Sequence, residues 1–105
     1  MKIFKKLIRD KIPEIMEREG KKLSTRVLTD DKEYIEALLR KMIEEVQELR
    51  HGDDPREKIA YLYEIIDALI AAHGFNKEEI FAVRKTRYKE RGGFDKRLFL
   101  EGVLE

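Results

Sequence analysis

Two stretches of the chain, residues 31–50 and 56–73, repeat apolar side chains at the three- and four-residue spacing of an α-helix, and only a short connection separates them. The connection, His51-Gly52-Asp53-Asp54-Pro55, has the composition of a turn, and Pro55 suits the start of the next helix. Because short connections favour antiparallel neighbours, the two stretches predict a helical hairpin. The first stretch repeats Tyr34, Ile35, Leu38, Leu39, Met42, Ile43, Val46 and Leu49, with Asp30 or Asp31 as its cap.

Before this hairpin, a short helix is predicted within residues 10–19. Pro13 is tolerated in a first turn, and Gly20 follows the last residue of the helix. Residues 21–29 contain β-favouring or apolar types without a helical period, which predicts an extended segment.

After the hairpin, Gly74 ends the second long helix, and Asn76 caps a further helix that runs from Lys77 to about Arg91. Gly92-Gly93 follows, and the apolar residues within 96–105 predict no definite form. Since the sequence contains no repeat and no linker, residues 1–105 are expected to form one all-α domain, an antiparallel helical bundle.

The composition narrows the class of protein. At 105 residues the chain buries only about two thirds of its unfolded surface, so we expect homo-oligomerisation, as a dimer or tetramer, to complete the core. The net charge of +1, from 23 basic and 22 acidic residues, argues against a partner that is a nucleic-acid polymer. No apolar run reaches about 18 residues and no signal peptide is recognisable, so we expect no membrane partner and a cytoplasmic location. Cysteine is absent, which excludes disulfides and thiolate chemistry. Asn and Gln are scarce, as they are in heat-adapted proteins.

The second long helix contains two isolated acids. Between Ile59 and Ala72 the only charged residues are Glu64 and Asp67, and apolar residues lie on opposite sides of the helix. A helix that is apolar nearly all round is buried on more than one face. Because buried carboxylates must be neutralised, Glu64 and Asp67 are expected to be paired with cations or bound to a metal ion.

The first long helix contains a second acidic pair at the same spacing, Glu45-x-x-Glu48. Such pairs are common by chance in a chain with 22 acids, and alone this one would be a solvated helix face. Opposite Glu64 and Asp67, however, it would complete an oxygen cage that suits Mg²⁺ and leaves room for phosphate. A salt-bridge network with cations from elsewhere in the fold is the alternative.

The full spacing, Glu44-Glu45-x-x-Glu48, fifteen intervening residues and then Glu64-x-x-Asp67, resembles the signature of the MazG-type all-α NTP pyrophosphohydrolases. That superfamily includes the phosphoribosyl-ATP pyrophosphohydrolases and the dimeric dUTPases. The N-terminal segment Lys6-Leu7-Ile8-Arg9-Asp10-Lys11-Ile12-Pro13-Glu14-Ile15 and the segment Lys89-Glu90-Arg91-Gly92-Gly93-Phe94 look like the flanking motifs of a small branch described as house-cleaning pyrophosphohydrolases.

The resemblance implies Mg²⁺-dependent hydrolysis of a nucleoside triphosphate, canonical or non-canonical, to a monophosphate and pyrophosphate. By position, the resemblance implies that the catalytic metal ligands are Glu45, Glu48, Glu64 and Asp67. It implies that Glu44 lies next to these ligands without binding the metal itself. A carboxylate not fully used in coordination would act as general base. The alternatives are a phosphoribosyl-ATP pyrophosphohydrolase and a non-catalytic helical oligomerisation or interaction module.

Several basic residues are candidates for binding the phosphates of a nucleotide substrate. Lys41 lies one turn before Glu45 and would either pair with that acid or reach a phosphate. The residues near the end of the last predicted helix would either close over phosphates or form an ordinary helix C-terminus with favourable cations. The substrate-binding candidates are Arg9, Lys11, Arg87, Lys89, Arg91, Gly92 and Gly93.

Overall fold

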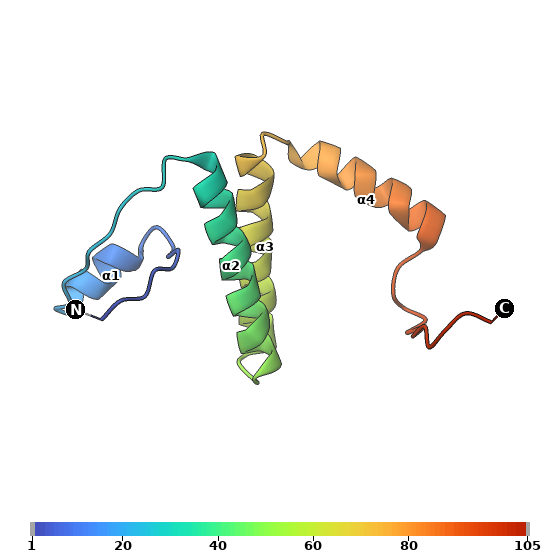
Figure 1. Cartoon of the computed structure of the whole chain (residues 1–105), viewed down its shortest axis with the longest axis horizontal. Helices are drawn as coiled ribbons and strands as arrows, with labels where there is room; N and C mark the ends of the chain where they lie inside the picture. Colours follow the sequence, from blue (N-terminus) through green and yellow to red (C-terminus); the bar gives the residue numbers. More distant parts are fainter. Residues whose placement is uncertain (1, 105) are drawn as a thin grey trace. The chain divides into compact units, whose positions relative to one another are not determined.

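The computed structural model describes residues 2–104 (Figure 1). Within that range the regular structure consists of four α-helices without a strand, which confirms the predicted all-α class. The chain divides into two compact units, one ending at Gly74 and the other beginning at Phe75. In order, the helices are α1 (Ile12–Arg18), α2 (Asp31–Arg50), α3 (Pro55–Ala72) and α4 (Lys77–Arg91).

The long helices begin and end at local signals in the sequence. The side chain of Asp30 caps α2 by accepting a hydrogen bond of 3.2 Å from the backbone N–H of Glu33. The side chain of Asp54 caps α3 in the same way, accepting from Arg56 N–H at 3.1 Å, and Pro55 occupies the first helical position. Between them Gly52 has a φ of 98°, a value that favours glycine and lets the chain reverse after α2.

Helices α2 and α3 pack side by side as the predicted hairpin (Figure 1). Leu38 of α2 and Ile65 of α3 are the buried apolar residues of the described chain, so the contact between the helices is centred on these two side chains. Glu45, one of the predicted ligands, is buried in the same hairpin.

A second apolar stripe of the hairpin remains exposed. Leu39 directly follows the buried Leu38, and Ile66 directly follows the buried Ile65. In two antiparallel right-handed helices, the residues after such facing positions turn toward the same side of the pair. The exposed members of the stripe are Leu39, Ile43 and Val46 on α2 and Ile59, Tyr63 and Ile66 on α3.

The sequence predicted that α3 would be buried on more than one face. Among the described helices, α3 packs against α2, so the face centred on Ile65 is covered while the stripe with Ile59, Tyr63 and Ile66 stays accessible. Among the residues described, no helix is both long and apolar enough to span a membrane.

The first unit also contains α1, which is shorter than the predicted helix over residues 10–19. Its cap residue, Lys11, makes no side-chain cap bond, while Pro13 lies in the first turn as predicted. Residues 21–29 have no regular secondary structure.

The second unit consists of α4 and the segment after it. Asn76 caps α4 as predicted, its side chain accepting from Glu79 N–H at 2.8 Å, and Gly92 follows the last residue with a φ of 78°. Residues 98–104 contain no regular structure, and the large apolar side chains of the segment are exposed, namely Phe94, Leu98, Phe99, Leu100, Val103 and Leu104.

Candidate functional site

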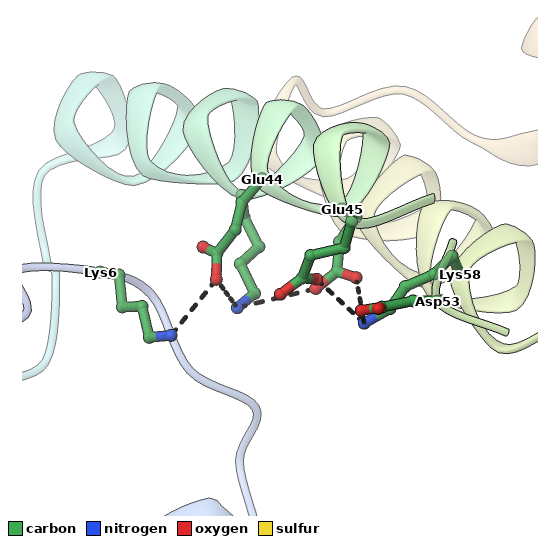
Figure 2. Close-up of polar contacts among 7 residues, drawn as sticks. Lys6, Glu44, Glu45, Asp53 and Lys58 are labelled. Atoms are coloured by element: carbon green, nitrogen blue, oxygen red, sulfur yellow. Dashed lines mark hydrogen bonds and ion pairs between the residues drawn. The ribbon is translucent and has the colours of Figure 1, made fainter. Parts of the chain in front are cut away.

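The polar centre of the hairpin is the ammonium group of Lys58, which α3 places opposite α2. Its Nζ lies 2.9 Å from Glu48 Oε2, 3.1 Å from Glu45 Oε2 and 4.0 Å from Asp53 Oδ2. Figure 2 shows Lys58 and Asp53 beside the carboxylate of Glu45. Lys58 reaches this place because it begins the second turn of α3, directly after the connection that returns the chain to the end of α2.

The ion pairs continue along α2 and reach the N-terminal segment. Lys41 Nζ lies 3.5 Å from Glu44 Oε1 and 3.8 Å from Glu45 Oε1, so Lys41 pairs with these acids within its own helix. Lys6 Nζ donates a 3.2 Å hydrogen bond to Glu44 Oε1 (Figure 2). We call these seven residues the ion-pair cluster: Lys6, Lys41, Glu44, Glu45, Glu48, Asp53 and Lys58.

Glu45 is the least accessible charged residue of the cluster, with 4% of its surface exposed. Its Oε2 faces the Lys58 ammonium but makes no hydrogen bond, because the 3.1 Å contact is not aligned as one. A carboxylate removed from water loses hydration that only close charges and hydrogen bonds can replace. Both oxygens of Glu45 are therefore compensated by ion pairs, Oε2 by Lys58 at 3.1 Å and Oε1 by Lys41 at 3.8 Å.

The cluster shifts the proton affinities of two of its members. The hydrogen bond donated by Lys58 lowers the pKa of the Glu48 carboxyl, and Lys41 adds to that effect. In return, the same hydrogen bond to Glu48, together with Glu45, raises the pKa of Lys58. Both groups are therefore held in their charged forms across the neutral range.

The other two predicted ligands lie elsewhere on α3. Glu64 and Asp67 are both exposed, whereas Glu45 is buried and Glu48 is bound to Lys58. Because Glu64 precedes Ile65 by one residue, helical periodicity turns it toward the side of the hairpin that contains Glu48.

The structure does not gather the four predicted ligands into one group. Within residues 2–104, no three acidic or histidine side chains are arranged to hold a metal ion. The prediction placed Glu64 and Asp67 beside the pair formed by Glu45 and Glu48. In the structure, the neighbour of this pair is the Lys58 ammonium.

Lys58, Asp53 and Lys6 are cluster members that the sequence reasoning missed. For Lys58 a signal existed in the length of the connection. If the chain reverses at residues 52–53, a residue five or six positions after the reversal lies opposite residues four to eight positions before it. This places Lys58 near Glu45 and Glu48. Nothing in the sequence indicated the partner of Lys6, because it comes from a segment without periodic structure.

The predicted phosphate-binding residues fall in both units. Arg9 stacks on the ring of Tyr61, with its guanidinium carbon 5.1 Å from the ring centroid, and Lys58 Nζ lies 5.0 Å from the same centroid. Arg9 is therefore next to the cluster, whereas Lys11 is exposed at the start of α1.

The remaining candidates belong to the second unit. Arg87 pairs with Glu90 at 3.0 Å, while Lys89 and Arg91 are the basic residues of the last turn of α4. A side chain at Gly93 would contact the ring of Tyr88 at 3.2 Å, so Gly93 gives the backbone a close approach to that ring. These features agree with an ordinary helix C-terminus, and they leave the phosphate-binding prediction untested.

Comparison with protein-family models, with curated proteins and with solved structures finds no match to this chain.

Proposed function

We propose that this chain is a divalent-cation-dependent hydrolase that cleaves a nucleoside triphosphate to a monophosphate and pyrophosphate. The observation that carries the proposal is a nearly buried glutamate, Glu45, in a Glu-x-x-Glu pair on a helix that packs against a second helix with Glu64-x-x-Asp67. Apolar residues at position 45 would pack with less cost, so a carboxylate there is better explained by chemistry than by stability.

The surroundings of the pair support a phosphate-bearing substrate. Three cations lie close to the pair. Lys41 contacts Glu44 and Glu45, Lys6 contacts Glu44, and Arg9 stacks on the ring of Tyr61. Cations in this position would balance the negative charge that a triphosphate brings to an acidic cluster.

A metal ion does not fit the described residues as they are arranged in the single chain. Glu45 and Glu48 offer neighbouring carboxylates, but Lys58 is bound to both, and no third acid completes a ligand group within residues 2–104. We therefore assign no catalytic step to a metal here. The proposal requires a rearrangement of these side chains when cation and substrate bind.

We further propose that the working form is a homodimer or homotetramer. The exposed apolar stripe of α2 and α3 would be covered by the same stripe of a second copy, as in a bundle of four helices.

The exposed stripe also favours a second candidate function, a helical interaction module without catalysis. Such a module would use the same apolar surface but would have no need of Mg²⁺. The two candidates therefore differ in the response of the protein to the metal.

Pyrophosphate release from a panel of nucleotides tests the proposal. The panel contains canonical and damaged nucleoside triphosphates and phosphoribosyl-ATP, each with Mg²⁺ and with excess EDTA. We expect Mg²⁺-dependent release from at least one nucleoside triphosphate. Release that persists in EDTA would contradict the metal requirement, preference for phosphoribosyl-ATP would name the alternative substrate, and no release from any compound would favour the module.

A further inference from the structure

The charge of the chain is divided unevenly along its sequence. Residues 84–97, which cover the second half of α4 and the start of the segment after it, contain seven basic and two acidic residues, a formal charge of +5. The remaining residues together carry −4, so the net charge of +1 averages two regions of opposite sign. A whole-chain value near zero argues against a nucleic-acid polymer as partner, but it does not describe the field around α4.

Four residues in the middle of α4 share one face of the helix, which we call the basic-aromatic face: Phe81, Arg84, Lys85 and Tyr88. Their spacing of three and four residues places each cation one turn from both rings. All four residues are exposed, with 57% of Phe81 and 63% of Tyr88 accessible. The face therefore presents two aromatic rings to solvent with two cations between them.

The two cations of this face are not explained by stabilisation of the helix. Neither Arg84 nor Lys85 has an acid three or four positions away, and among residues 2–104 neither forms an ion pair. The helix dipole favours cations in the last turn, but both residues precede that turn. Arg87, by contrast, pairs with Glu90 at 3.0 Å. The charges of Arg84 and Lys85 are thus available to a ligand from outside the chain.

The ring of Tyr88 has a close neighbour in the backbone. The N–H of Gly92 donates a hydrogen bond of 2.7 Å to the carbonyl oxygen of Tyr88, and a side chain at Gly93 would contact the Tyr88 ring at 3.2 Å. The glycines therefore let the chain pass close to this ring, while Tyr88 stays largely exposed. A ring that is already restricted in this way loses less conformational freedom when a flat ligand stacks on it.

We propose that the basic-aromatic face binds single-stranded nucleic acid, with bases stacked on Phe81 and Tyr88 and backbone phosphates paired with Arg84 and Lys85. Aromatic rings next to cations suit this ligand, because every base has a flat face and every backbone unit has a negative charge. A duplex keeps the flat faces of its bases stacked inside the helix, so the rings favour single strands. The inference goes beyond the proposed function and does not depend on it.

Two other anionic partners fit this face less well. A helix that lies on an anionic membrane separates its apolar residues from its cations onto opposite faces. On α4 the cations lie between the rings, and the exposed Val83 falls on the opposite side of the helix from them. An acidic protein segment would use the cations without requiring the rings.

Fluorescence anisotropy of the full chain with a labelled single-stranded deoxythymidine oligonucleotide of about 12 nucleotides tests the binding. We expect a Kd in the micromolar range that rises with salt, and weaker binding of a duplex of the same length. Thymidine triphosphate at equal nucleotide concentration should not displace the strand. Displacement would make the face a mononucleotide site, and equal binding of the duplex would show attraction by charge alone. Either result, or no binding of the strand, would overturn the inference.

Substitutions on the face separate stacking from charge. Tyr88→Leu should weaken binding on the order of 10-fold because a stacking surface is lost, whereas Tyr88→Phe keeps the ring and should bind like wild type. Arg84→Gln should weaken binding and lower the slope of log Kd against log salt concentration by about 0.7, the value for one phosphate of a single strand. Arg50→Gln, at an exposed arginine of α2, is the matched control. Equal losses for Arg50→Gln and Arg84→Gln would contradict the assigned face.

Photocrosslinking of the wild-type protein decides the inference even if a variant does not fold. An oligonucleotide that contains iododeoxyuridine should crosslink to the peptide with Phe81 or Tyr88, identified by mass spectrometry. Crosslinks confined to other segments would show that the strand binds elsewhere, and the assignment to α4 would be wrong. Sedimentation with vesicles of phosphatidylcholine and phosphatidylserine tests the membrane alternative. Binding to these vesicles without binding to the oligonucleotide would replace the nucleic acid by a lipid surface and overturn the inference.

Discussion

Glu45 is the buried charged residue of the part of the chain that the structure describes. Folding removes its carboxylate almost completely from water and compensates both of its oxygens by ion pairs, without a hydrogen bond to Oε2. Its neighbours Glu44 and Glu48, by contrast, each accept a hydrogen bond from a lysine. Glu44 and Glu48 therefore form ordinary ion pairs near the surface. Glu45, on the same helix, is a carboxylate whose loss of hydration costs free energy.

At this scale the first prediction concerns the acids of α3. If the proposed function holds, Glu64→Gln and Asp67→Asn should each lower Mg²⁺-dependent pyrophosphate release on the order of 100-fold, because the proposal makes both acids ligands of the cation. Glu64 is exposed, so Glu64→Gln should leave the melting temperature of the metal-free protein essentially unchanged. Glu57→Gln, an exposed acid of the same helix, serves as the control and should keep full activity. Normal turnover combined with a large loss of stability in both variants would make these acids structural.

The second prediction is the pH dependence that follows from Glu48. Because Lys58 lowers the folded-state pKa of Glu48, this pair contributes stability above the usual carboxyl value of about 4.3, and the contribution is lost as the pH falls through the lower folded value. Melting curves in EDTA should show wild type above Glu48→Gln at pH 6 to 8, with the difference shrinking below about pH 4.3. The raised pKa of Lys58 has the opposite sign, so its contribution persists below about pH 10.4 and is lost as the pH rises through the folded value. A constant difference down to pH 3 would contradict the assignment.

The sequence singled out Glu44, Glu45 and Glu48 of the cluster, but neither Asp53 nor the Lys58 cation between the acids. Lys41 could be paired with Glu45 because both lie on one helix at a fixed spacing. The contact of Lys58 with Glu45 and Glu48 depends on the register between two helices, which the packing of Leu38 against α3 and the length of the connection set together. Periodicity within one helix contains no information on that register.

At the scale of elements, the helix boundaries could be predicted closely. α2 spans Asp31–Arg50 as expected, and α3 is displaced by only one residue from the predicted 56–73. Caps and glycines act through the nearest backbone groups, so local sequence is sufficient to place them. α1 begins two residues later and ends one residue earlier than the predicted 10–19, and its cap residue Lys11 makes no side-chain cap bond.

The cap of α2 leads to the third prediction. Asp30→Ala removes the acceptor of the Glu33 N–H and should destabilise the protein by about 1 kcal/mol. Urea unfolding measures the change, and Asp31→Ala, one residue further on, is the matched control because the side chain of Asp30 is the one that caps. Equal losses in both variants would indicate a general effect of charge near the helix N-terminus instead of a specific cap.

At the scale of the whole molecule, the described chain leaves much apolar surface uncovered. The stripe on α2 and α3 and the apolar residues after α4 are exposed, and the buried apolar residues are few. A chain of 105 residues has a thin stability margin even with a complete core. The sequence predicted further burial from the two apolar sides of α3, but the periodicity of one helix does not identify the surface that would cover the exposed side.

The last prediction tests whether copies of the chain cover the stripe. Sedimentation at low micromolar concentration should show at least a dimer, and the melting temperature should rise with protein concentration, because association favours the folded state. Ile43→Lys should shift the protein toward monomer and lower its melting temperature, since Ile43 is 61% exposed in the single chain and lies in the middle of the stripe. Arg40→Ala is the control on the same helix, because Arg40 pairs with Glu36 at the surface and should leave assembly unchanged. A well-folded wild-type monomer with a concentration-independent melting temperature would show that the hairpin is stable with this face in water, and the proposal of a bundle completed by a second copy would be wrong.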